Sequence, residues 1–385
     1  MYKSCMFSCI GLLIATSAFA DIDDRLDDLE REMRQVSIYT PQDTIGAGFT
    51  SARPEVLVEG ERVNITFDLL YWHPKVGGTE YAYSFQPNIV QTGSIILPEA
   101  DGRTKYNDLD WEWGLKVGLG YNLPHDGWDL TALYTWYEPN STTHSTKASP
   151  SALMPLRLFT TMLALKAKSH FDLAYHNVDV NLGRSYFVSR MIAFRPFVSV
   201  KTTWLDLDQN VIYTASSLND FLFPGPERTT GLDFKSKNSS HFWGIGPRLG
   251  LNSKWFLGNG FNLFNDVAGS ILYGYFKTRH KEFVPPNEAV FDSGDIIKGR
   301  YRFHRFIPFV QMYLGMGWQG YVNHDKQYIT LKLGYEVQYY WRVNQMHQEE
   351  DVSNPPGSFS ERVHYERYSD DVMLYGITGE FKLDF

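Results

Sequence analysis

Long runs in which apolar and polar residues alternate are the feature that most limits how this chain can fold. The final run sets Phe381, Leu383 and Phe385 against the charged residues between them. Successive side chains of a β-strand point to opposite faces, so each run predicts a strand with one apolar and one polar face. Such runs occupy 62–72, 110–122, 127–137, 170–183, 192–205, 241–256, 260–276, 301–319, 325–343 and 373–385.

Composition favours a membrane barrel over a soluble sheet protein. No stretch of about 18 apolar residues is present, which excludes a helical membrane span. Aromatic residues make up 16% of the chain and gather at the ends of the runs. Aromatic girdles of this kind are typical of strands that end at a membrane–water boundary. In lipid every backbone group must be bonded internally, so such a sheet has to close. A soluble all-β fold is the alternative.

The connections between the runs support the same fold. Short links at 122–126, 183–190, 257–260 and 320–325 alternate with long links at about 73–109, 138–169, 206–240, 277–300 and 344–369. Outer-membrane barrels have short periplasmic turns and long external loops. We therefore expect residues 62–385 to form an all-β, antiparallel transmembrane barrel with periplasmic termini and about ten strands, within a range of roughly ten to sixteen.

Three irregularities qualify this pattern. The run at 170–183 changes phase near His176, which would fit a β-bulge. Pro247 and Pro308 fall inside two other runs, where proline is awkward in a central strand. The link at 148–168 is unusually apolar for an external loop. It could constrict the lumen, form an extra strand pair or pack on a neighbouring subunit.

The N-terminus reads as a signal peptide over residues 1–20, with an apolar stretch and a small-x-small cleavage site. Both cysteines, Cys5 and Cys9, lie within it, so we expect no disulfide and no thiol chemistry in the mature chain. Residues 21–38 predict a short helix with a heptad seam over 22–36, which would either join copies into a homo-oligomer or lie on the periplasmic rim. Residues 39–61 read as a linker before the barrel.

If the apolar face meets lipid, the polar face lines the lumen. This predicts inward-facing charges at Asp68, Glu112, Lys116, Asp129, Arg195, Lys201, Arg248, Asp266, Lys332, Glu336, Arg342, Glu380, Lys382 and Asp384. Their mixed signs predict weak ion selectivity. The alternative is that these charges pair and plug a narrow interior, because small barrels are filled by side chains and open channels are typical of about sixteen strands.

Other chemistries find little support in the sequence. We expect no enzyme, because no nucleophile-elbow or zinc-protease motif is present, and no metal or cofactor. His144, His280 and His364 fall in loops, where we expect solvated side chains. The formal net charge of −8 without a basic stripe argues against nucleic-acid binding. Long external loops leave open a surface adhesin or structural envelope protein that contacts a host surface.

The segment "FDLLYWHPKVGGTEYAYS" at 67–84, the signal peptide, the amphipathic strands and Phe385 together resemble the major outer membrane protein-like family of Legionella and chlamydiae. The resemblance implies an outer-membrane porin for small solutes. A terminal strand such as "GEFKLDF", with Phe381, Leu383 and Phe385, is similar to the assembly signal read by the barrel-insertion machinery. The absence of cysteine from the mature chain departs from the family's cross-linked members, so envelope cross-linking is not implied.

Overall fold

The computed structural model describes the part of the chain that carries the predicted barrel. Its described residues are 51–52, 63–85, 87–89, 96–98, 102–123, 127–148, 151–158, 163–189, 191–216, 230–284, 294–322, 327–352, 362–367 and 369–385. The predicted signal peptide and heptad helix, and the linker apart from 51–52, lie outside these residues. Among the described residues, no helix is long and apolar enough to cross a membrane.

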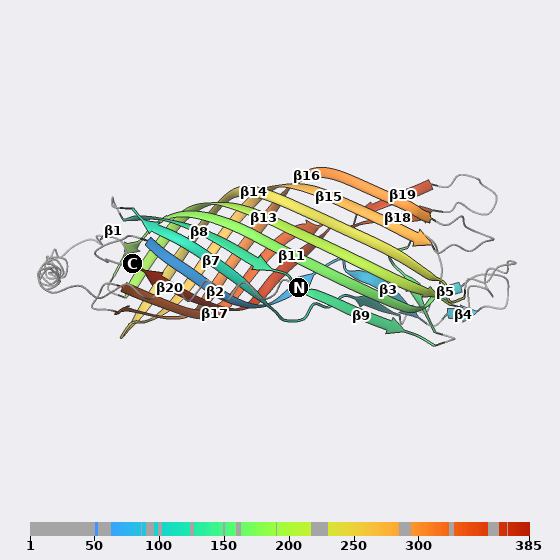
Figure 1. Cartoon of the computed structure of the whole chain (residues 1–385), viewed down its shortest axis with the longest axis horizontal. Coiled ribbons are helices and arrows are strands. Elements are labelled where there is room, and N and C mark those ends of the chain that lie inside the picture. Colours follow the sequence, from blue (N-terminus) through green and yellow to red (C-terminus); the bar gives the residue numbers. More distant parts are fainter. Residues whose placement is uncertain are drawn as a thin grey trace, which may run out of the picture. The chain divides into compact units, whose positions relative to one another are not determined.

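Ten long strands form a closed antiparallel barrel within the described residues (Figure 1). They are β2 (Val63–Val76), β7 (Glu112–Asn122), β8 (Trp128–Tyr137), β11 (Ala164–Arg184), β13 (Ile192–Ala215), β14 (Asp233–Gly258), β15 (Phe261–Val284), β16 (Gly294–Val322), β17 (Gln327–Asn344) and β20 (Asp370–Asp384). The barrel closes where β20 pairs with β2, with Asn64 opposite Asp384. The predicted barrel fold and the count of ten strands are confirmed.

Shorter strands join this sheet or pair beside it. β9 (Asn140–Thr146) continues β8 along β11, and β1 (Ser51–Ala52) pairs with β12 (Tyr186–Phe187). The segment β10 (Ala152–Pro155) links β11 to β3 (Glu80–Phe85), which pairs with β6 (Arg103–Tyr106). Two small hairpins, β4 (Pro87–Ile89) with β5 (Ile96–Pro98) and β18 (His347–Val352) with β19 (Arg362–Arg367), complete the strands.

The two ends of the barrel differ in their connections. Short links join β7 to β8, β11 to β13, β14 to β15 and β16 to β17, all at the end that carries Val63 and Asp384. We call this the turn end, and the opposite end the loop end. All the long links leave from the loop end (Figure 1). The alternation of link lengths in the sequence therefore corresponds to the two ends of one barrel.

An apolar band surrounds the turn-end half of the barrel. On β16 the outward side chains from Phe306 to Met316 are exposed, with Phe306 at 65% and Met316 at 57%. Ten residue steps along a strand cover about 33 Å. With the usual tilt this gives a band about 25 Å tall, the height of hydrocarbon that a transmembrane barrel crosses.

Beyond this band the two faces of the strands exchange character. On β13, Val198 and Val200 face outward within the band, whereas Asp206 and Asp208 face outward beyond it. The inward face changes in the opposite sense, from Lys201 to apolar side chains such as Leu205. Water surrounds this part of the strand, so the polar face turns outward and the apolar face packs inside.

This exchange replaces the bulge predicted near His176. The alternation of β11 runs unbroken through His176 and Asn177, and its only register shift lies between Ala164 and Lys166. Val178, Val180 and Leu182 face outward toward the band, whereas Phe171, Leu173 and Tyr175 face inward. The bulge prediction was wrong because the change of phase reflects the strand leaving the apolar band, not a change in its geometry.

Both prolines lie within strands, at breaks in pairing. Gly246 and Pro247 on β14 are skipped in the ladder with β15. Pro308 on β16 pairs with β15, but the pairing of β16 with β17 begins only at Phe309. A missing backbone N–H is tolerated at such positions, because no ladder partner depends on it.

Candidate functional site

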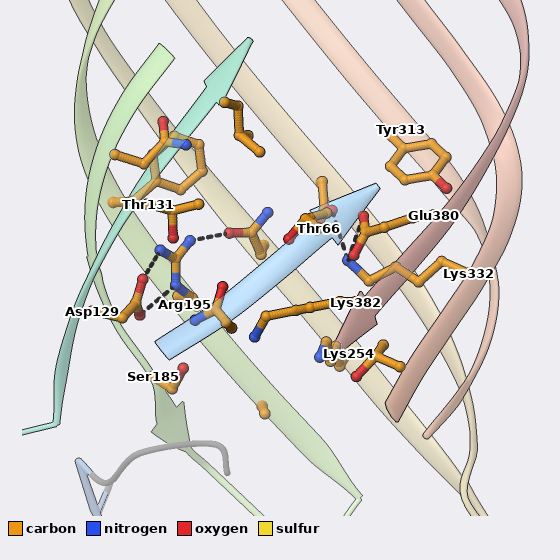
Figure 2. Close-up of a pocket in the computed structure, with 18 of the residues that line it drawn as sticks. Thr66, Asp129, Thr131, Ser185, Arg195, Lys254, Tyr313, Lys332, Glu380 and Lys382 are labelled. Carbon is orange, nitrogen blue, oxygen red and sulfur yellow. Dashed lines mark hydrogen bonds and ion pairs between the residues drawn. The ribbon is translucent and has the colours of Figure 1, made fainter. Parts of the chain in front are cut away.

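A polar cavity of about 210 Å³ occupies the turn-end half of the barrel interior. Its walls come from the inward faces of all ten barrel strands, including Asp68 of β2, Lys116 of β7 and Arg195 of β13. Figure 2 shows side chains from opposite walls pointing into this space, among them Arg195, Lys332 and Lys382. Within the described interior, this cavity is the starting point for any transport function.

Charges close to the turn end form pairs around the cavity wall. The Arg195 guanidinium donates through Nε to Asp129 Oδ2 at 2.8 Å and through Nη1 to Asn252 Oδ1 at 2.8 Å. On the opposite wall Lys332 Nζ lies 3.0 Å from Glu380 Oε1 (Figure 2). The ammonium of Lys382 lies 2.9 Å from Asp384. In each of these pairs a cation on the cavity wall is neutralised by a neighbouring carboxylate.

Deeper in the barrel, Lys116 and Glu336 form the centre of a buried network. The Lys116 ammonium lies 3.2 Å from Glu336 Oε2 and 3.4 Å from Asp68 Oδ2. Glu336 is fully buried and also accepts hydrogen bonds from Gln311 at 2.6 Å, Gln338 at 2.9 Å and Thr378 at 2.9 Å. A buried carboxylate needs this many donors to offset the loss of water.

A second buried network lies beside it. Asp179 accepts a hydrogen bond from Asn177 Nδ2 at 2.6 Å, and its Oδ1 lies 3.5 Å from Lys201 Nζ and 3.9 Å from Arg248. Arg248 also donates to Gln311 at 2.6 Å, which in turn donates to Glu336. A continuous chain of polar contacts therefore connects the two networks across the barrel.

Most of the charges singled out in the sequence lie in this interior. Twelve of them lie on the cavity wall or in the two networks, namely Asp68, Lys116, Asp129, Arg195, Lys201, Arg248, Asp266, Lys332, Glu336, Glu380, Lys382 and Asp384. The terminal apolar residues Phe381, Leu383 and Phe385 alternate with the inward Lys382 and Asp384, and Phe381 is 40% exposed on the outer face.

Two predicted lumen residues lie elsewhere. Glu112 is the first residue of β7, and its side chain is exposed. Arg342 is also exposed, since a break in register between Tyr340 and Asn344, with a φ of 52° at Arg342, turns its side chain outward. Val343 takes the buried position instead.

Around the cavity and in the two networks, two charges were not among the predicted lumen residues. Asp179, which lies inward between Val178 and Val180 on β11, was not included among the predicted lumen charges. Continuous alternation from Gly183 backward would have placed it inward. Lys254, near the turn end of β14, also lines the cavity. With these two included, the described interior networks hold seven cations and seven anions, which gives no net charge.

An apolar layer closes the barrel above the cavity. Trp72, Phe171, Phe242 and Phe309, from four different strands, are each at most 2% exposed. The remaining members of the cluster are Leu70, Val76, Leu109, Tyr137, Leu173, Tyr175, Leu205, Leu207, Leu272, Phe276, Ile307, Tyr340, Val343, Met346, Val372 and Leu374. Their side chains fill the cross-section at mid-height, so the polar cavity does not continue through the barrel.

Polar atoms of this layer bond to one another and to neighbouring polar side chains. Tyr175 donates its hydroxyl to Gln338 at 2.8 Å and contacts the Tyr340 hydroxyl at 2.9 Å. Trp72 Nε1 donates to Thr378 at 3.0 Å. The Lys201 ammonium lies 4.3 Å from the centre of the Phe309 ring, where the ring face attracts a cation. These contacts join the layer to the charged networks on its turn-end side.

A second obstruction lies at the loop end. Residues 77–85, which we call the inserted segment, pass inside the wall, where Tyr81 and Ala82 pack against Tyr213 of β13. The Tyr213 hydroxyl donates to the Tyr81 carbonyl, and burial raises the pKa of this phenol well above its ordinary value, so it remains a neutral donor. Gln209 donates to the Thr79 carbonyl at 2.8 Å.

The apolar link singled out at 148–168 holds the inserted segment. Arg157 is 2% exposed and donates to the Glu80 carbonyl at 2.8 Å and to the Gly78 carbonyl at 2.5 Å. β10 pairs with β3, so part of the link forms an extra strand. Its apolar side chains, such as Leu153, pack inside the loop end together with the inserted segment.

The three histidines expected in loops all lie in strands, with His144 on β9, His280 on β15 and His364 on β19. His280 was expected in a solvated loop, but its side chain is fully buried inside β15, with Nε2 2.9 Å from Glu282 Oε1 and Nδ1 in contact with Asn238. The strand simply extends further than its alternation indicated. His144 is exposed on β9. No group of three or more metal-ligating side chains occurs among the described residues.

Comparison with known proteins identifies a family. The profile of the Legionella pneumophila major outer membrane protein precursor matches residues 58–385. No curated protein matches the sequence.

Three solved barrels give low similarity. The outer membrane protease OmpT from Escherichia coli is 9% identical, with 86% of this chain and 99% of that chain covered and a TM-score of 0.39. The toluene transporter TodX from P. putida is 10% identical, with 85% and 91% covered and a TM-score of 0.28. A Pseudomonas aeruginosa FadL homologue is 10% identical, with 88% and 99% covered and a TM-score of 0.27. Values this low carry no information about substrate or activity.

Proposed function

Because the chain belongs to the family of the Legionella pneumophila major outer membrane protein, we propose that it is an outer-membrane pore for small polar solutes, closed in the conformation described here. The observation that carries the proposal is the polar cavity of about 210 Å³ in the turn-end half. A barrel that served only as a scaffold could fill this half with apolar side chains, as it does at mid-height. The charged, solvent-accessible lining favours passage of hydrated solutes instead.

The lining predicts a weakly selective pore. Seven cations and seven anions balance on the cavity wall and in the two networks, and most of them are paired with an opposite charge within 4 Å. Rings of one sign select ions of the opposite sign, whereas paired charges leave little net field. We expect neutral solutes and small ions of both signs to pass at similar rates.

Passage requires two rearrangements. The inserted segment has to leave the loop end, and the apolar layer has to admit water. Apolar constrictions gate channels by excluding water, so a polar substitution in the layer should favour the open state. Phe309 is a suitable position, because it faces inward on β16 and contacts both Lys201 and Tyr340.

Single-channel conductance in a planar bilayer tests the proposal. We expect rare, small current steps for the unchanged protein and more frequent steps for Phe309→Ser. The matched control is Phe306→Ser, which removes a ring of the same size from the lipid-facing side of the same strand. The proposal that the protein is a pore is contradicted if none of the three forms gives current steps although heat-modified gel mobility shows that the barrel is folded.

A second candidate is a surface protein that acts through the loop end. The observation that favours it is the length of strand beyond the apolar band. β13 continues for eleven residues past Trp204, to Ala215, which is about 35 Å of strand with an outward polar face. If the links from β13 to β14 and from β17 to β20 are shortened to tight turns, binding to host cells should be lost. Binding that survives trimming contradicts this role.

The placement in the membrane follows from the same family. We propose that the turn end faces the periplasm and that the strand ending in Phe385 is recognised by the barrel-insertion machinery. A cysteine introduced at His144, on the loop-end side, should react with an impermeant thiol reagent in whole cells, whereas a cysteine at Asn259 in a turn should not. The reverse pattern contradicts the orientation.

The predicted heptad over 22–36 remains a proposal for self-association. Its deletion should convert an oligomer to monomers in detergent, as measured by sedimentation. An unchanged assembly indicates that copies meet through the barrel wall.

A further inference from the structure

A grid of positive charge covers one side of the barrel immediately beyond the apolar band. It consists of nine outward-facing positions on three adjacent strands, which are Lys237, Ser239 and His241 on β14, Lys277, Arg279 and Lys281 on β15, and Lys298, Arg300 and Arg302 on β16. Seven of the nine are lysine or arginine, and none is acidic. We call these positions the cationic grid.

Strand register brings like charges directly opposite one another. Lys281 pairs with Lys298, Arg279 with Arg300, and Lys277 with Arg302, in three successive rows of β15 and β16. Lys237 of β14 extends the first row opposite Lys281. Like charges directly opposite on one face of a sheet are destabilising. Three such pairs in succession concentrate positive charge on this part of the outer surface.

The side chains belong to the outer surface and not to the lumen. The alternate positions on β15, Thr278, His280 and Glu282, are each at most 2% exposed and face inward. Lys281, Lys298, Arg300 and Arg302 are exposed on the other face. Asp206 and Asp208 on β13 border the grid on one side, where Asp206 lies 2.9 Å from His241. The β15–β16 side has no acidic side chain at the grid positions.

The height of the grid is set by the rows beneath it. The next row toward the turn end is Trp243, Tyr275 and His304, and the row after that is Ile245, Tyr273 and Phe306. His304 stacks on Tyr273 with ring centroids 5.4 Å apart. Aromatic rows of this kind mark the boundary between hydrocarbon and headgroups. The cations therefore lie at the level of lipid headgroups, a few residues beyond the hydrocarbon.

We propose that the cationic grid binds the phosphate groups of an anionic glycolipid in the leaflet that surrounds the loop end. The charge is complementary, the phosphates lie at the height of the grid, and the acyl chains would continue along the apolar rows below it. Lysine and arginine donate charge-assisted hydrogen bonds to phosphate oxygens, and arginine can do so with two parallel bonds. The proposal rests on the membrane orientation given above but not on pore activity.

Lipid titration followed by native mass spectrometry tests the site. The protein is purified in neutral detergent and titrated with diphosphorylated lipid A. We expect one or more retained lipids for the unchanged chain and loss of retention for Lys277→Gln/Arg279→Gln/Arg300→Gln. Each basic residue near an anionic surface strengthens binding about fivefold, so three substitutions should weaken it about a hundredfold. Increasing salt should weaken binding to the unchanged chain.

Matched controls separate this site from general charge. Lys75→Gln/Lys166→Gln/Lys168→Gln removes the same charge from exposed positions on β2 and β11, and should leave lipid retention unchanged. Dephosphorylated lipid A should bind weakly to every form. A soluble phosphorylated sugar without acyl chains should bind much less tightly than lipid A. Equal binding of that sugar, or equal loss in both triple variants, overturns the proposal.

Thermal unfolding tests the site a second way, because the order of the two unfolding temperatures should reverse when lipid A is added. In neutral detergent without lipid, the grid variant should unfold at the same or a higher temperature than the unchanged protein, because cross-strand repulsion is relieved. With lipid A present, the unchanged protein should be the more heat-resistant of the two, because ligand binding stabilises the folded state. A variant that is less stable under both conditions indicates a purely structural role and contradicts lipid binding.

Discussion

Removal of the Lys116 ammonium should expose how strongly the interior depends on paired charges. Lys116→Met keeps most of the length of the side chain and deletes the charge that lies 3.2 Å from Glu336 and 3.4 Å from Asp68. At an effective dielectric constant of about 20, each of these pairs corresponds to about 5 kcal/mol of Coulomb attraction. Burial of the three groups offsets much of this attraction. Breaking a buried pair by removing one partner typically lowers the free energy of unfolding by about 3–5 kcal/mol, and we expect that range here.

Unfolding by guanidinium in detergent, followed by tryptophan fluorescence, measures this loss. Lys116→Met/Glu336→Gln should recover part of the stability, because the introduced amide is neutral and could still bond to Gln311 and Thr378. We expect a coupling between the two substitutions of at least about 1 kcal/mol. Lys75→Met, on the exposed face of β2, should change the free energy by less than about 0.5 kcal/mol. A loss below about 1 kcal/mol for Lys116→Met, or purely additive effects, refutes the reasoning.

Three further outcomes follow from local geometry. Gly334→Ala should lower the free energy of unfolding by about 1–3 kcal/mol, because the new Cβ would lie 2.3 Å from the Leu314 carbonyl oxygen. The control Gly269→Ala, whose Cβ would have only a 3.8 Å contact, should leave the free energy unchanged in the same denaturant assay. Arg157→Met should accelerate amide hydrogen exchange in the inserted segment, because the segment loses two charged hydrogen-bond donors. Exchange in the barrel strands should not become faster. Equal exchange of the inserted segment in both forms contradicts the role of Arg157 in holding it. Deletion of Phe385 should reduce the amount of barrel assembled in cells but not the yield of refolding in detergent. Heat-modified gel mobility measures both quantities. A loss in both assays indicates that Phe385 stabilises the barrel and is not read by the insertion machinery.

Local patterns were sufficient to predict the barrel wall. Alternation between adjacent residues depends only on strand geometry, and the alternation of short and long links depends only on the order of connections. Ten strands and the inward position of charges such as Lys332 could therefore be predicted before any contact was known. The errors occurred where the environment of a strand changes along its length. At His176 the surroundings change from lipid to water, and at Arg342 a local break in register turns the side chain outward.

The sequence by itself determined that the chain forms amphipathic strands of a membrane barrel, because alternation is a property of each strand alone. Only the tertiary structure decided whether its interior is open. Closing ten strands brings Trp72, Phe171, Phe242 and Phe309, which lie far apart in the chain, into one packed layer. Register between strands likewise places Arg279 opposite Arg300 and creates the cationic grid. Both features depend on which residues of different strands become neighbours, and pairing across a sheet cannot be read from any single strand.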